Sequence, residues 1–114
     1  MTTSNVQATF ERLLLLPGVI GAVLVDGDGV PVRTNLPENA AQMYANRMRP
    51  LVTLARSMVN DMETGDQLSY VRLRTRRQEV MVATENEHTI ILIQDNRALD
   101  ESRRSSAASG RWSK

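Results

Sequence analysis

The chain of 114 residues contains no cysteine, one histidine and few aromatic residues: one Trp, two Tyr and one Phe. The absence of cysteine excludes a disulfide framework and any metal site built on thiolates. The sequence also lacks a secretory signal and any apolar run long enough to span a bilayer, so we expect no membrane insertion. These absences make the cytoplasm the expected location.

The chain carries no excess of charge of either sign, since 14 basic residues nearly balance 13 acidic ones and the net charge is +1. No long-range field therefore directs it to nucleic acid or to anionic lipid. The dense basic cluster at 72–77 has only Tyr70 beside it for stacking on bases, and Glu79 follows. We therefore expect no nucleic-acid binding. All basic residues except Lys114 are arginines, which favours either a protein-binding surface with bidentate contacts to carboxylates or a genome rich in arginine codons.

Candidate catalytic and metal-binding residues are sparse. His88 follows the polar segment 85–87, with no Ser or Cys nucleophile placed to use it and no second His to share a metal, so we expect an exposed loop residue. The acidic turn 26–29 superficially resembles a calcium loop, but Val30 and Pro31 occupy positions that such a loop gives to a carboxylate and a glycine. No phosphate-binding glycine pattern is present. The sequence therefore predicts a protein that is not an enzyme and holds no metal or cofactor.

The first third of the chain predicts a helix followed by a β-hairpin. Residues 4–16 carry apolar side chains at helical intervals, and the Pro-Gly pair at 17–18 ends that helix. The run 19–26 is apolar on both faces and is turned back by an Asp-Gly-Asp-Gly segment into a short strand at 30–34. Gly21 lacks a side chain inside the first strand, which is tolerable if a helix packs closely over it.

The longest predicted element is a helix over residues 38–63. Its apolar residues recur at alternating intervals of three and four and form one stripe: Ala41, Tyr44, Met48, Leu51, Ala55, Met58 and Met62. Neighbouring apolar residues make this stripe broader than one sheet face normally covers, so we expect the helix to pack on two partners. The register continues through Pro50, which favours one kinked helix over two separate ones.

Three short β-runs follow as a meander, at 68–74, 78–84 and 89–94. The first alternates apolar and basic residues as an edge strand does, whereas the third is apolar on both sides and needs a cover on each face. The predicted fold is therefore mixed α/β (α+β): a five-stranded antiparallel sheet between helices, with the first and last strands at its centre. We expect one domain over residues 1–95 and a flexible Ser/Arg-rich tail over residues 96–114.

Four motifs follow one another in an order and spacing that resembles the roadblock family of dynein light chains. They are the Gly-Val-x-Gly opening at 18–21, the hairpin tip Asp28–Pro31, the helix segment Ala55–Ser57 and the arginine-rich meander. The resemblance covers residues from about Phe10 to Gln94. It implies the same sheet between helices, no catalysis, homodimers formed by the long helix and the adjacent middle strand, and attachment to dynein intermediate chains.

The function that this resemblance implies is a non-catalytic dynein light chain, which scaffolds the motor tail for microtubule-based transport or ciliary motility. The implied location is the cytoplasm and cytoskeleton, with a ciliary or flagellar axoneme as a second setting, and a heterodimer with a paralogue is the alternative to a homodimer. The alternative function is a roadblock-type regulator or scaffold of a small GTPase, because similar folds occur in such proteins. For the dimer or partner interface we predict residues of the long helix and of the first meander strand: Tyr44, Met48, Leu51, Ala55, Met58, Leu68, Tyr70, Arg72 and Arg74.

Overall fold

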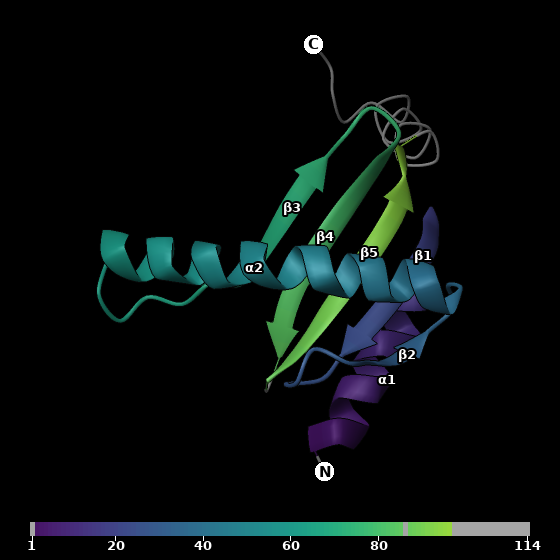
Figure 1. Cartoon of the computed structure of the whole chain (residues 1–114), viewed down its shortest axis with the longest axis horizontal. Helices are drawn as coiled ribbons and strands as arrows, with labels where there is room; N and C mark the ends of the chain where they lie inside the picture. The colour runs from purple at the N-terminus through teal and green to yellow at the C-terminus, as the bar shows by residue number, and fades with distance from the viewer. Residues whose placement is uncertain (1, 86, 97–114) are drawn as a thin grey trace, which may run out of the picture.

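The computed structural model describes residues 2–85 and 87–96, and within these ranges it contains two helices and five strands (Figure 1). The helices and strands, in chain order, are α1 (Thr2–Leu14), β1 (Val19–Val25), β2 (Pro31–Thr34), α2 (Glu38–Met62), β3 (Tyr70–Arg74), β4 (Gln78–Glu85) and β5 (His88–Asp95). Every predicted element is present, and the ends differ from the prediction by one or two residues. The predicted tail lies outside the described residues apart from Asn96. No helix in the described ranges is both long enough and apolar enough to cross a membrane.

The strands form one antiparallel sheet in the order β2-β1-β5-β4-β3. The first and last strands of the chain therefore pair at the centre, as their two apolar faces predicted. Ile91 of β5 lies between Val23 of β1 and Val82 of β4 in this register. The confirmed topology leaves β2 and β3 as the two edges of the sheet.

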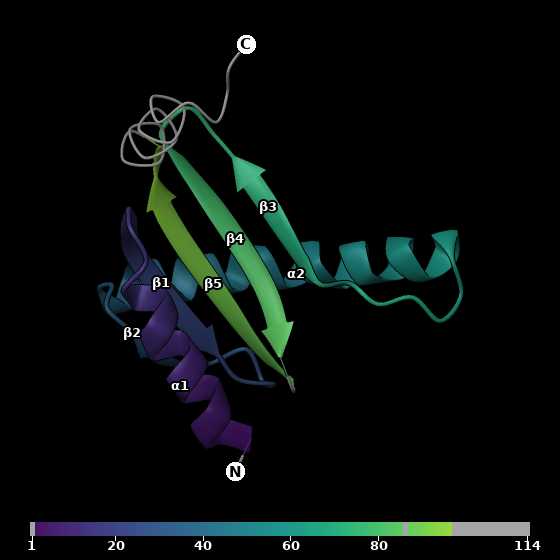
Figure 2. The ribbon, with the colours of Figure 1, turned by 180° about the vertical axis from the view of Figure 1, so that it is seen from behind.

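Each face of the sheet carries its own apolar core. On one face Ala41, Ala45 and Val52 of α2 pack on valines and isoleucines of β1, β4 and β5. On the other face Val6 and Phe10 of α1 pack on residues of β1 and β5. Figure 2 shows that α1 lies toward the β2 side of the sheet and leaves this face of β3 and β4 uncovered by a helix. The central strands are thus covered on both faces, whereas β3 is not.

Gly21 is closely approached, as its missing side chain predicted, but by a different segment. A Cβ at this position would lie 2.7 Å from Cδ2 of Leu36, which belongs to the loop before α2. The close contact at Gly21 therefore comes from a loop side chain. The loop leucine fills this space because β1 and β2 are joined by a tight hairpin that brings the start of α2 over the first strand.

The helix α2 is one continuous element through Pro50, and it is longer than the sheet is wide. Its buried side chains all lie between Ala41 and Val52. Figures 1 and 2 both show the C-terminal half of α2 projecting beyond β3 before the chain turns back to that strand. The last three turns of α2 consequently bury no side chain against their own sheet.

Candidate interaction surface

The open edge of the sheet and the projecting end of α2 lie next to each other. Among the described residues β3 pairs only with β4, so its second edge has no strand partner. Beside this edge, Leu54, Met58 and Met62 of α2 are each more than half exposed, at 59%, 53% and 76%. Together, β3 and these three side chains form what we call the overhang surface. An exposed apolar patch next to an unpaired strand is typical of a protein–protein interface.

The two flanks of α2 face opposite ends of the sheet. Because an α-helix has about 3.6 residues per turn, Tyr44, Leu51, Ala55 and Met58 fall on one flank, and Arg49 and Arg56 fall on the other. The hydroxyl of Tyr44 accepts a hydrogen bond of 3.0 Å from Nε2 of Gln78, at the start of β4. The apolar flank therefore faces the β3–β4 turn, and the arginine flank faces the two hairpin tips at the other end of the sheet.

The predicted interface residues divide by burial. Tyr44, Met48 and Leu68 pack, partly buried, against the core beneath α2. Leu51 and Ala55 are also half-buried, whereas Met58, Tyr70, Arg72 and Arg74 are exposed. These four exposed side chains are the members most available to a partner. Membership of the interface stays a prediction for the whole set.

Arg72 and Arg74 of β3 form ion pairs with Glu79 of β4, a contact that the sequence analysis did not predict. The side chain of Glu79, 4% exposed, accepts a 2.9 Å contact from Nε of Arg72 and a 3.4 Å contact from Nη1 of Arg74. The guanidinium of Arg72 also stacks 5.5 Å above the ring centre of Tyr70. In the sequence Glu79 appears only as an acid after a basic cluster. Glu79 lies directly opposite Arg74 in the pairing of β3 with β4, so the two side chains point to the same side of the sheet. This register is what would have predicted the contact.

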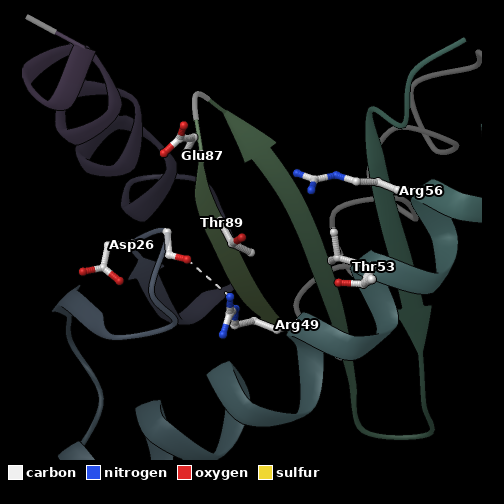
Figure 3. A pocket seen from close by; sticks show the side chains of 8 residues that line it. Asp26, Arg49, Thr53, Arg56, Glu87 and Thr89 are labelled. Carbon is white, nitrogen blue, oxygen red and sulfur yellow. Dashed lines mark hydrogen bonds between the residues drawn. The ribbon is translucent and has the colours of Figure 1, made fainter. Parts of the chain in front are cut away.

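A polar pocket of about 230 Å³ lies on the arginine flank of α2 (Figure 3). Arg49, Thr53 and Arg56 come from the helix, Asp26 and Gly27 from the first hairpin tip, and Glu87 and Thr89 from the second. Its volume is below the range of about 300 to 1,000 Å³ that small-molecule sites usually have.

Several polar groups of this pocket already stabilise the hairpin tip. Oδ1 of Asp26 accepts hydrogen bonds of 2.9 Å from the backbone N–H groups of Asp28 and Val30. Nη2 of Arg49 donates to the carbonyl oxygen of Gly27 over 3.3 Å. Within residues 2–85 and 87–96 no three His, Asp or Glu side chains lie together as a metal site would require. The pocket therefore serves first to fasten the hairpin to α2.

The sequence of this chain matches the model of the Roadblock/LC7 domain over residues 5–95. This match spans nearly all of the described fold. The chain belongs to the Roadblock/LC7 family. The resemblance found in the sequence is thereby confirmed at the level of the family.

Solved structures share the fold of this Roadblock/LC7 chain at low sequence identity. A Roadblock/LC7 domain from Streptomyces avermitilis has a TM-score of 0.65 and 19% identity, and the match covers 75% of this chain and 73% of that one. MglB from Myxococcus xanthus has a TM-score of 0.66 and 14% identity, with 86% and 81% covered. An MglB structure with a tetrameric arrangement has a TM-score of 0.65 and 17% identity, with 83% and 74% covered. At these identities the likeness shows a common fold for this Roadblock/LC7 chain.

Proposed function

We propose that this chain is a non-catalytic scaffold that forms a homodimer through the overhang surface and binds a small GTPase. The observation that carries the proposal is the position of α2, whose exposed apolar end projects beyond the open edge strand β3. A monomer would leave both the strand edge and these side chains in water. A second copy covers both at once.

A two-fold axis perpendicular to the sheet and close to β3 accounts for both parts of the overhang surface. Such an axis joins the two β3 strands in antiparallel fashion and keeps both α2 helices on the same face. The apolar flanks of the two helices then meet side by side over the joint. Self-assembly of this fold has support from the tetrameric arrangement of MglB.

The partner that we favour is a small GTPase rather than a dynein intermediate chain. Structures with the same fold include MglB proteins and a Streptomyces domain. The resemblance to roadblock-like regulators and scaffolds of small GTPases favours the same class of partner for this chain. The surface also suits a folded partner: the outer side of α2 carries a shallow groove that borders the overhang surface at Leu54 and is otherwise lined by Asn46, Arg49, Pro50, Thr53 and Ser57. In the dimer two such grooves lie close together and face the same way, which offers a broad platform instead of a narrow cleft.

Two measurements test this proposal. Light scattering at micromolar concentration should give a mass near twice the chain mass of 12.7 kDa, and a monomer mass would overturn the dimer. Purified small GTPases from the source organism, loaded with GDP or with a non-hydrolysable GTP analogue, should bind the immobilised dimer in one nucleotide state more tightly than in the other. Capture of dynein intermediate chains, with no GTPase bound in either state, would overturn the choice of partner and restore the dynein function.

A further inference from the structure

The carboxylate of Glu79 is buried next to the edge strand β3, on the same side of β4 as Met81, which packs against the core beneath α1. A buried carboxylate is costly unless cations pair with it. Here two arginines of the neighbouring edge strand, Arg72 and Arg74, supply that pairing. Two exposed arginine side chains are thus oriented toward one buried negative charge. If position 79 only had to fill space in the fold, an apolar residue would do so without the free-energy cost of burying a charge.

The register explains how one carboxylate reaches both arginines. Arg74 lies directly opposite Glu79, and Arg72 lies two residues further along the same side of β3. Both guanidinium groups therefore turn inward over β4. This orientation draws them away from the open edge and leaves the backbone N–H and C=O groups of β3 accessible to another strand.

The symmetry of a strand pair limits how two copies of β3 can meet. Residues directly opposite each other in an antiparallel pair point to the same side of the sheet. When the two strands are identical and related by a two-fold axis perpendicular to the sheet, one residue must therefore lie directly opposite its own copy, and the axis passes midway between them. For the strand Tyr70–Arg74 only an axis at Arg72 pairs all five residues. It sets Tyr70 opposite Arg74 of the second copy and Val71 opposite Leu73 of the second copy. These are an aromatic–cation pair and an apolar pair, both favourable across a sheet.

The same register brings Arg72 opposite its own copy, and two like charges in that position repel each other. We propose that the two β3 strands pair in the register centred on Arg72 and that Glu79 is the positioning residue that permits it. The carboxylate of Glu79 lowers the formal charge of each group of Arg72, Arg74 and Glu79 from +2 to +1. This inference rests on the proposed dimer and specifies its register and its charge compensation.

Single-cysteine crosslinking tests the register, because the chain has no cysteine of its own. Arg72→Cys should form an intermolecular disulfide under mild oxidation, since directly opposite residues lie within the Cα distance that a disulfide spans. Val71→Cys and Leu73→Cys are the matched controls, because each would be displaced by two residues from its own copy and should remain mostly uncrosslinked. Preferential crosslinking of either control, with the parent still dimeric, would overturn the register.

Glu79→Gln tests the charge compensation. At about 50 mM salt the dimer dissociation constant of this variant should rise about tenfold or more, and at about 500 mM salt it should return to within about threefold of the parent, because salt screens repulsion between like charges. Glu85→Gln, on the same strand and the same side but at the end away from the β3 pairing, is the control and should change little at either salt concentration.

The double variant Arg72→Gln with Glu79→Gln separates repulsion from loss of structure. It removes the two opposed arginines together with the compensating carboxylate, so its dimer should regain most of the parent affinity at low salt. A salt-independent loss in Glu79→Gln that the double variant does not repair would overturn the role of Glu79. A parent chain that is monomeric would instead refute the proposed dimer, so the two failures are distinguishable.

Discussion

At the scale of single residues, two arginine contacts have different tasks. Arg49 fastens the tip of the first hairpin to α2, because it donates to Gly27 and lies against Gly29. Arg72 instead joins the edge strand to the buried carboxylate of Glu79. The first contact stabilises the subunit, and the second prepares the surface by which we propose that subunits meet.

The contact between Arg49 and Gly29 makes Gly29 a sensitive position. Gly29 has a φ of +87°, and a Cβ there would overlap the guanidinium of Arg49, whereas Gly65, with a φ of +93°, has open space around it. Gly65→Ala should therefore lower the free energy of unfolding by the left-handed backbone cost of about 1 to 2 kcal/mol. Gly29→Ala should cost about 1 kcal/mol more, because Arg49 must move aside and give up its bond to Gly27. Urea unfolding of both variants measures the difference. Equal losses would mean that Arg49 moves aside freely.

At the scale of elements, α2 combines two functions along its length. Its first half packs on the sheet through Ala41, Ala45 and Val52, and its second half exposes the apolar residues of the overhang surface. A broad apolar stripe in the sequence therefore reflects a change of partner along the helix. Met48 packs against the core beneath the helix, so the exposed Met58 is the better position at which to test association.

We predict that Met58→Glu dissociates the dimer while the subunit remains folded. A carboxylate in an apolar helix–helix contact should cost about 3 kcal/mol, which corresponds to a dissociation constant roughly a hundredfold higher. Met43→Glu is the matched control, because Met43 is similarly exposed at 45% but lies in the half of α2 that covers its own sheet. Analytical ultracentrifugation should give a monomer for the first variant and a dimer for the second. Two dimers with parental affinity would move the interface away from Met58.

At the scale of the whole molecule, the described fold closes at the end of β5. The backbone N–H of Asp95 donates to Gly18 over 2.9 Å, and Asn96 donates from its backbone to Arg77 and from its side chain to Thr75. These bonds tie the last strand to the start of β1 and to the β3–β4 turn. The Ser/Arg-rich segment that follows has little capacity to bury a core.

A truncation series should locate this boundary. Removal of all residues after Glu101 should leave the thermal midpoint and the dimer mass unchanged, because the deleted segment is poor in apolar residues and lies beyond the family match. Removal of all residues after Gln94 deletes the bonds of Asp95 and Asn96, and it should lower the midpoint by several degrees. Aggregation or a monomer mass in the longer variant would contradict the boundary and make the tail part of the structure.

The sequence by itself determined the order of elements, the position of the central strands and the two edges of the sheet. These follow from local patterns: strands apolar on both faces need two covers, and alternating strands do not. Only the tertiary structure decided that Leu36 packs against Gly21, that Glu79 pairs with both arginines of β3, and that α2 projects beyond the edge strand of its sheet. Each of these depends on the relative placement of segments distant in the chain, which hydrophobic periodicity does not encode because it reports which face of an element is buried and not what lies against it.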